Sequence, residues 1–214
     1  MLKLIIMFII FNPILSWNPL KYYADPRVHI LGNHGILGTI HANIAPLMTN
    51  LIDKSAYDGR NIREEIINSF PKNYSVVDLC CGVGYSTANM KNVLGIDTSL
   101  PMIKKAKELF PKKKFLFGNA ETFKPINNVD ITTCFFSFHE MPQFARKNII
   151  DNAIKFTNKE LIIVDIAWDY CPSEHMLFTE PYLDDYLSNI QSDLQDFEYH
   201  ILKDKRVNLW KLKI

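Results

Sequence analysis

The chain has few of the residues and patterns that mark several large protein classes. It contains four cysteines in 214 residues, and no Cys or His pair has the spacing of a zinc site, so we expect no metal centre. Cys80 and Cys81 are adjacent, where a mutual bridge would be strained, so the cysteines are expected to be buried thiols. The formal net charge of +1 provides no overall field to attract nucleic acid or an anionic membrane. We therefore expect no nucleic-acid partner.

Long hydrophobic runs are also lacking, except for one near the start of the chain. Residues 4–11 are apolar and follow Lys3. This run is too short for a permanent span across a bilayer core of about 30 Å, so we expect no such span. A basic start, an apolar middle and the small Ser16 are typical of a signal peptide, although Ile14 fits a cleavage site poorly. A helix that packs on the domain or lies in a membrane interface is the alternative.

The leader also bears on where the protein is located. Followed by Trp17, it resembles the bipartite plastid-import presequences of algae, which are cut before an aromatic residue. Import into a plastid would reconcile secretory entry with reduced thiols, and a membrane-associated or cytoplasmic location is the alternative. We divide the chain into a targeting segment at 1–16, an N-terminal arm and cap helix at 17–59, and the main domain at 60–214.

The most informative stretch is a short apolar strand followed by a glycine turn. The run at 76–79 precedes Gly82 and Gly84, which let the backbone approach a ligand before a helix begins. A second apolar strand ends at Asp97, where a βαβ unit that binds an adenine-bearing ligand places the carboxylate for the ribose hydroxyls. A dinucleotide site would need a third glycine at Thr87, so an oxidoreductase is the weaker interpretation. The two glycines alone could also form only a tight turn.

These residues resemble the cofactor site of the class I S-adenosylmethionine-dependent methyltransferases. The first motif of that family is an acidic residue followed by Gly-x-Gly-x-Gly. Asp78, Gly82 and Gly84 match it, and the small, apolar Cys80 replaces the first glycine. The resemblance spans roughly residues 60–214 and continues, in the family's order, through the segments 97–102, 118–121 and 138–142. It implies S-adenosylmethionine as the cofactor and a methyl transfer as the reaction.

The alternation of apolar runs predicts an α/β domain. Strands are expected near 75–80, 92–97, 114–118, 129–136 and 160–166. Helical stripes begin at Ile40 and Ile62, residues 17–38 are expected to form an extended arm, and the tail from Phe197 alternates like a β-hairpin. The resemblance implies a Rossmann-like doubly wound seven-stranded sheet with an antiparallel C-terminal hairpin and helices on both faces.

The resemblance also assigns cofactor contacts. Asp97 would accept from the ribose hydroxyls, and backbone amides from Gly82 to Gly84 would meet the methionine carboxylate. Asn119 stands where the family often has an Asp that contacts the exocyclic amine of adenine, and it keeps an acceptor oxygen. The full set of expected cofactor residues is Asp78, Cys80, Gly82, Gly84, Asp97, Thr98, Met102, Asn119 and Ala120.

A small, partly hydrophobic molecule is the expected methyl acceptor. His139 follows the fourth strand and could deprotonate an oxygen or nitrogen acceptor, or it could anchor the loop or line the pocket. Glu140 could orient that imidazole or cap the helix after Pro142. The residues expected to shape the acceptor site are Phe138, Trp168 and Tyr170, although the last two could simply pack against the final helix.

Two other functions are compatible with the sequence. A non-catalytic methyltransferase-like binding protein would account for the departures at Cys80 and Asn119, whereas the retained Asp97 argues against it. A nucleic-acid methyltransferase would need a basic surface or a characteristic acceptor motif after the fourth strand, and neither occurs. The oligomeric state is not determined by the sequence. His29, His34 and His41 could reach an acceptor only if the N-terminal arm folds over the pocket.

Overall fold

The structure, a computed structural model, describes residues 19–214. The expected targeting segment at 1–16 lies outside this range and stays a prediction. So do the location it implies and the domain boundaries. Within residues 19–214, no helix combines the length and the apolar character needed to cross a bilayer.

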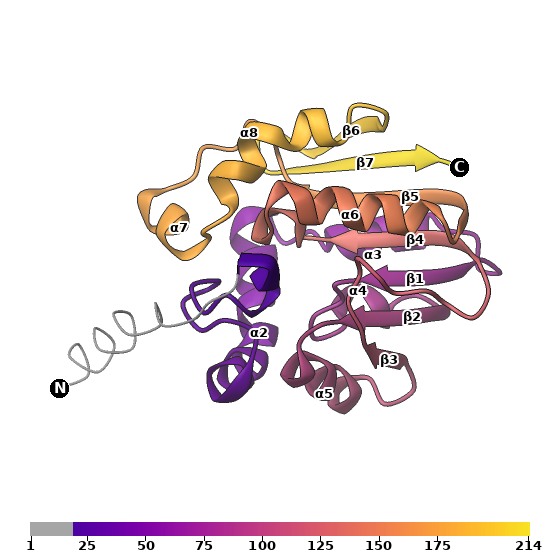
Figure 1. The fold of residues 1–214 in the computed structure, drawn as a ribbon, viewed down its shortest axis with the longest axis horizontal. Helices are drawn as coiled ribbons and strands as arrows, with labels where there is room; N and C mark the ends of the chain where they lie inside the picture. The colour runs from indigo at the N-terminus through magenta and orange to yellow at the C-terminus, as the bar shows by residue number, and fades with distance from the viewer. Residues whose placement is uncertain (1–18) are drawn as a thin grey trace.

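The core of the fold is one seven-stranded sheet with the order β3-β2-β1-β4-β5-β7-β6 (Figure 1). The strands are β1 (Ser75–Leu79), β2 (Asn92–Asp97), β3 (Lys114–Phe117), β4 (Val129–Phe135), β5 (Thr157–Ile166), β6 (Glu198–Lys203) and β7 (Val207–Lys213). The first five run parallel, while β7 is antiparallel to both β5 and β6. The chain order reverses between β1 and β4, which confirms the doubly wound sheet with its C-terminal hairpin.

Helices cover both faces of the sheet, as predicted. One face packs against α6 (Gln143–Ile154) and α8 (Leu183–Asp193), and the other packs against α3 (Ile62–Asn68). The central strands are apolar on both sides because neither face meets water; the β5 run from Leu161 to Val164 is at most 1% exposed. The remaining helices are α4 (Tyr85–Ala88), α5 (Leu100–Leu109), α7 (Glu174–Thr179) and the short 3-10 helices η1 (Pro19–Ala24) and η2 (Phe138–Glu140).

The N-terminal region is more regular than its sequence indicates. The expected extended arm contains η1 and a series of turns, and the first long helix, α2 (Gly35–Ala56), begins five residues before Ile40. Gly35 has a φ of +63°, a left-handed conformation that lets the chain turn from the arm into the helix. Figure 1 shows η1, α2 and α7 gathered at the end of the sheet to which the parallel strands point.

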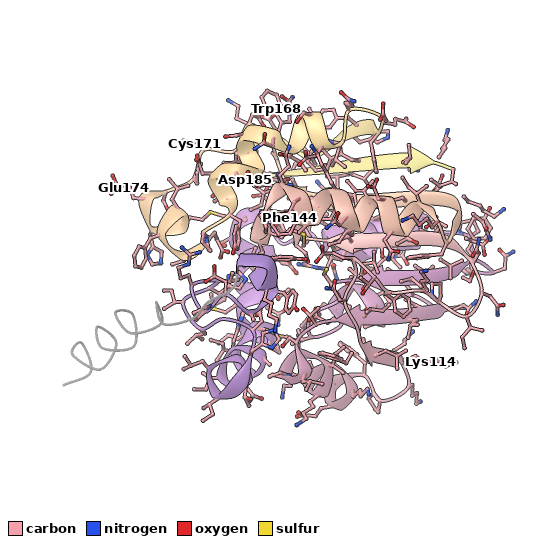
Figure 2. All side chains as sticks on the ribbon, in the orientation of Figure 1. Lys114, Phe144, Trp168, Cys171, Glu174 and Asp185 are labelled. Atoms are coloured by element: carbon pink, nitrogen blue, oxygen red, sulfur yellow. The ribbon has the colours of Figure 1, made fainter. Side chains whose placement is uncertain are left out.

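The four cysteines are free thiols that differ in burial. Cys81 and Cys134 are buried and Cys80 is half-buried, but Cys171 is exposed in the segment after β5. Figure 2 shows Cys171 at the periphery of the molecule. The expectation of buried thiols is therefore wrong for Cys171, which lies in a loop with no apolar pattern around it.

Candidate active site

A cavity of about 630 Å³ opens at the carboxyl ends of the parallel strands. This is where ligands bind in open α/β sheets, because the loops on either side of the reversal in strand order diverge there. The expected cofactor residues that line the cavity are Cys80, Gly82, Asp97, Thr98, Met102, Asn119 and Ala120. Seven of the nine expected cofactor residues therefore lie together in this wall, and their role stays a prediction.

Asp97 ends β2 with its carboxylate held by two backbone amides. Oδ2 accepts from the N–H of Gly82 at 2.8 Å, and Oδ1 accepts from the N–H of Ser99 at 2.7 Å. Burial raises the pKa of this carboxyl to about 6, against the effect of the two amide donors. Each carboxylate oxygen still has a lone pair for a ligand hydroxyl.

Asp78 and Gly84 do not line the cavity. The buried carboxylate of Asp78 accepts from the hydroxyls of Ser86 at 2.7 Å, Thr87 at 2.6 Å and Thr133 at 2.8 Å, so it fastens α4 to β1 and β4. Burial raises the pKa of Asp78 despite these donors. Gly84 has a φ of +88°, and a Cβ there would lie 2.7 Å from the ring of Phe115. Both residues act on the site by shaping the loop, not by lining it.

Two backbone amides of the glycine turn donate to groups of the protein itself. The N–H of Gly82 is used by Asp97, and the N–H of Gly84 donates to the carbonyl of Cys81 at 2.9 Å. These two amides are thus engaged within the protein, and contact of a ligand carboxylate with the amides around this turn and the following helix N-terminus stays a prediction. Cys80, in place of the family's first glycine, has a φ of +54°, a left-handed conformation that favours glycine. The departure from the motif is thus accommodated with backbone strain.

A second group of polar atoms lies on the same side of the cavity as Asp97. The Oδ1 atom of Asn119 accepts from the N–H of Glu121 at 2.8 Å, which forms the turn after β3. The Oδ1 atom of Asn33, from the segment before α2, is buried without a partner among the described residues. The hydroxyl of Ser99 donates to the carbonyl of Asn33, so this segment is attached to the Asp97 loop.

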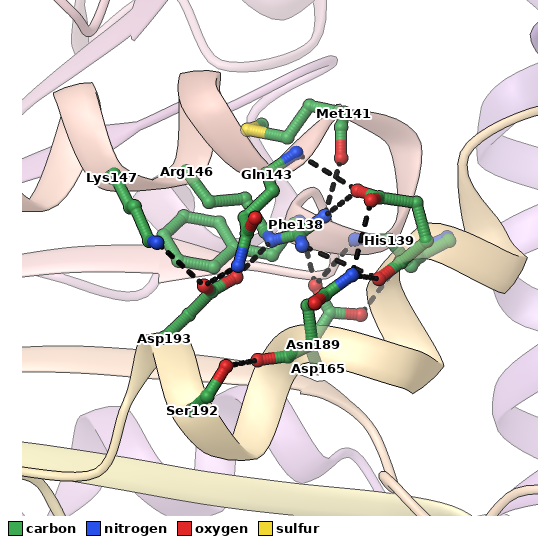
Figure 3. Close-up of polar contacts among 11 residues, drawn as sticks. Phe138, His139, Met141, Gln143, Arg146, Lys147, Asp165, Asn189, Ser192 and Asp193 are labelled. Atoms are coloured by element: carbon green, nitrogen blue, oxygen red, sulfur yellow. Dashed lines mark hydrogen bonds and ion pairs between the residues drawn. The ribbon is translucent and has the colours of Figure 1, made fainter.

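His139 lies in the cavity wall on η2, with its imidazole bound to β5. Nδ1 is 2.6 Å from Oδ1 of Asp165, and the backbone N–H groups of Phe138 and His139 donate to Oδ2 of the same carboxylate (Figure 3). Burial alone would lower the pKa of His139, but the charges of Asp165, Glu140 and Glu180 outweigh it and raise the pKa to about 9. The imidazole is therefore positively charged at neutral pH.

The other end of this loop is fixed by a buried arginine. Nη1 of Arg146, on α6, donates to the carbonyl of Met141 at 2.7 Å and to the carboxylate of Asp185 at 3.0 Å. The guanidinium also binds Asp193 on α8, so it joins two helices to the loop that carries His139 (Figure 3). Two buried ionic anchors thus hold η2 at the cavity.

The N-terminal arm folds over the cavity and completes it. Tyr22 donates to Glu121 at 3.0 Å, and the hydroxyl of Tyr182 donates to Asp25 at 2.9 Å. These contacts bring His29, His41 and Asn33 into the cavity wall. Sequence reasoning left His29 and His41 unassigned and did not single out Asn33, because the contacts that place them join segments far apart in the chain.

Glu140 binds the arm and caps no helix. Its Oε1 is 2.9 Å from Nε2 of His29 and 3.9 Å from Nε2 of His139, whereas α6 has no side-chain cap. Burial would raise the pKa of Glu140, but His29 and, to a lesser degree, His139 and His41 lower it to about 2. Nδ1 of His29 is 2.5 Å from Oε1 of Glu180. Carboxylates and imidazoles therefore alternate along this wall, in the order Glu180, His29, Glu140 and His139.

Of the expected acceptor residues, only Tyr170 lines the cavity. Phe138 is fully buried in the core, and Trp168 is 39% exposed. Figure 2 shows Trp168 near the outer edge, away from the arm. Within residues 19–214, no group of three His, Cys, Asp or Glu side chains is arranged to hold a metal ion.

Comparison with known proteins identifies the domain. Residues 76–160 match a family model described as a methyltransferase domain. This part of the chain is therefore similar to a methyltransferase domain. It has the fold of a TehB-like SAM-dependent methyltransferase from Corynebacterium glutamicum, with a TM-score of 0.54 and 14% identity over 80% of this chain and 97% of that one. An S-adenosylmethionine-dependent methyltransferase from Clostridium acetobutylicum has a TM-score of 0.54 and 12% identity, over 80% of this chain and 99% of that one.

A third solved relative, DhpI in a complex with SAH, gives a TM-score of 0.51 and 15% identity over 82% of this chain and 76% of that one. The resemblance to class I S-adenosylmethionine-dependent methyltransferases is thus confirmed by a matching family model and by the shared fold. The matched residues contain the glycine turn, Asp97 and His139. The arm with His29 and His41 lies outside it.

Proposed function

We propose that this protein transfers a methyl group from S-adenosylmethionine to a small, partly hydrophobic acceptor. The observation that carries the proposal is the position of Asp97 at the end of β2, in the wall of the large cavity, with lone pairs available for ligand hydroxyls. The methyltransferase domain match and the SAH complex of DhpI support the same cofactor.

The cavity wall fits such a cofactor in its donor and acceptor groups. Asp97 can accept from two vicinal hydroxyls, and the buried Oδ1 of Asn33 needs a donor that an adenine amine or a ribose hydroxyl would supply. Met102 and Ala120 provide apolar surface for an aromatic base. Gly82 faces open space, since a Cβ there would meet no atom within 4 Å. The residues present therefore fit the cofactor.

When bound, S-adenosylmethionine supplies a methyl group on a positively charged sulfur. The chain must align an acceptor with that methyl and keep water out of the cavity. The arm and α2 cover the cavity, and Ile44, Met48 and Met176 add apolar lining. These side chains favour an acceptor with an apolar body, while His139, Glu140 and Glu180 give that wall a polar part.

His139 as the proton acceptor stays a prediction. Its pKa of about 9 means that it already holds a proton at neutral pH. A role as the base would therefore require activity that increases as pH rises through about 9. As a charged group bound to Asp165, His139 can instead position the η2 loop in the cavity wall.

Calorimetric titration of the full chain with S-adenosylhomocysteine tests the proposal without an identified acceptor. We expect saturable binding, and no binding of NAD⁺ under the same conditions. Absence of S-adenosylhomocysteine binding would overturn the proposal. Binding without methyl transfer to any member of a broad panel of small phenols and amines would favour a non-catalytic binding protein. Salt-sensitive binding of RNA or DNA would favour a nucleic-acid substrate.

A further inference from the structure

His41 is held on α2 in one defined tautomer. Its Nδ1 lies 3.1 Å from the backbone carbonyl oxygen of Gly32. A carbonyl oxygen can only accept a hydrogen bond, so the hydrogen of the neutral imidazole is on Nδ1 and the lone pair is on Nε2. No hydrogen bond to Nε2 is found among residues 19–214, and His41 lines the cavity.

The groups around His41 keep it neutral. His29, in the arm, has carboxylates at both ring nitrogens, Glu180 at 2.5 Å and Glu140 at 2.9 Å, so both nitrogens carry hydrogen and the ring is charged. The ring centroids of His29 and His41 are 4.9 Å apart. Burial lowers the pKa of His41, and the charge of His29 lowers it further. The Gly32 carbonyl and the carboxylates of Glu140 and Glu180 raise this pKa, but their effect is smaller. His41 thus differs from His29 and His139, whose pKa values are raised.

A second acceptor atom on the same wall also needs a donor. Glu180 is 6% exposed, and its Oε1 binds His29. Its Oε2 is buried without a partner among the described residues. A buried charged oxygen without a donor is costly, so a ligand that brings a hydroxyl or amine to this wall would satisfy it.

From this geometry we propose that His41 is the general base of the reaction, and that the acceptor is a small molecule whose reacting oxygen or nitrogen carries a hydrogen. This inference rests on the proposed function and deepens it. His41 combines a fixed tautomer, an unengaged basic nitrogen and a place in the cavity. The imidazole of His139 lacks the second feature because its Nε2 faces Glu140 and its Nδ1 binds Asp165.

The proton transfer is balanced by the methyl transfer. The bond between the acceptor atom and its hydrogen breaks, and the proton moves to the lone pair of Nε2 of His41. The electron pair left on the acceptor atom forms the new bond to the methyl carbon, while the pair of the broken carbon–sulfur bond stays on sulfur. The resulting imidazolium then releases its proton to solvent.

NMR of the full chain with ¹⁵N-labelled histidine tests the state of His41 directly, without any acceptor. The His41 signals are assigned by their loss in His41→Asn. We expect hydrogen on Nδ1 and a titration midpoint below the ordinary value of 6.5. Hydrogen on Nε2, or a charged ring at pH 7, would overturn the proposal. This measurement tests the tautomer and the charge of His41 without requiring a catalytic assay.

Kinetics with a reactive phenol or amine test the role. The variant His41→Asn keeps an N–H that can donate to the carbonyl of Gly32 but removes the basic Nε2. We expect kcat to fall by about 100-fold or more, with the KM for S-adenosylmethionine nearly unchanged, and the rise of kcat/KM with pH below 6.5 to disappear. The matched control His200→Asn changes an exposed histidine on β6 and should behave as the wild type. An unchanged kcat in His41→Asn would overturn the proposal.

Failure of the proposed function and failure of the His41 assignment give different experimental results. If S-adenosylhomocysteine does not bind the wild-type protein, the proposed function is wrong. If it binds equally to the wild type and His41→Asn, and a reactive acceptor is methylated equally by both, only the assignment of His41 is wrong.

Discussion

Nε of Arg146 lies 2.8 Å from a carboxylate oxygen of Asp193, and both side chains are fully buried. The pair joins α6 to α8, and the same guanidinium donates to the carbonyl of Met141 at the end of the η2 loop. A buried charge that loses its partner keeps its desolvation cost, so this pair is expected to respond strongly to the loss of one member.

We expect Arg146→Leu to lower the free energy of unfolding by about 3 kcal/mol, because the buried carboxylate of Asp193 then keeps only the amide of Gln143 at 2.7 Å and the more distant Lys147 at 3.8 Å. Denaturant unfolding followed by circular dichroism measures this. The double variant Arg146→Leu/Asp193→Leu should regain part of the loss. The control Arg60→Leu breaks an exposed pair with Glu65 and should cost about 1 kcal/mol or less. Equal losses in Arg146→Leu and Arg60→Leu would contradict the buried pair.

Two glycines in the same turn are expected to give opposite phenotypes. Gly84→Ala places a Cβ 2.7 Å from the Phe115 ring at a φ of +88°, so we expect a loss of roughly 3 kcal/mol in stability. Gly82→Ala meets no atom within 4 Å and carries only the strain of its positive φ, on the order of 1 kcal/mol. Because Gly82 lines the cavity, Gly82→Ala should weaken binding of S-adenosylhomocysteine more than Gly84→Ala does. Thermal melts measure the loss of stability, and calorimetry measures the loss of binding. A larger loss of stability in Gly82→Ala, or weaker binding in Gly84→Ala, would refute the prediction.

The charge of Asp97 is expected to control cofactor affinity. Its pKa of about 6 means that the carboxylate gains a proton as pH falls through 6, and a protonated carboxyl is a weaker hydrogen-bond acceptor. We expect the Kd of S-adenosylhomocysteine to increase below pH 6, and Asp97→Asn to bind at least tenfold more weakly at pH 7.5. Calorimetry from pH 5 to 8 checks both, with the exposed Asp196→Asn as control. Wild-type affinity in Asp97→Asn would show that this carboxylate is not a cofactor ligand.

The sheet and the gathering of Asp97 and its neighbours in one cavity wall were predictable because they depend on local patterns. Apolar runs bounded by turns define buried parallel strands, and the ends of those strands meet at one edge of a sheet. The position of Asp97 at the end of β2 follows from that rule alone. The same rule does not say which polar residue faces the core, and Asp78 proved to bind three hydroxyls behind the cavity wall.

The part of the cavity wall that contains His29 and Glu140 could not be predicted because its contacts join distant segments. His29 and Glu140 are 111 residues apart, and nothing in the composition of the arm indicates that its turns fold back over the sheet. Trp168 and Tyr170 follow the end of β5, where alternation no longer fixes which side chain points inward; Tyr170 lines the cavity and Trp168 does not. The start of α2 at Gly35 was missed because its first turn contains Gly35 and Gly38, which are poor helix formers, and because no side chain caps it.

The contact between His139 and Asp165 is expected to make stability depend on pH. The pKa of His139 is raised from 6.5 to about 9, so its stabilising effect is fully present below 6.5 and is lost as pH rises through 9. Relative to the wild type, we expect His139→Gln to be destabilised by roughly 3 kcal/mol at pH 6 and by much less at pH 10.5. Melting temperatures from pH 6 to 10.5 measure this, with the exposed His200→Gln as control. A deficit that does not change with pH would mean that the imidazolium is not stabilised by Asp165. If methyl transfer also begins only as pH rises through 9, His139, and not His41, would be the base.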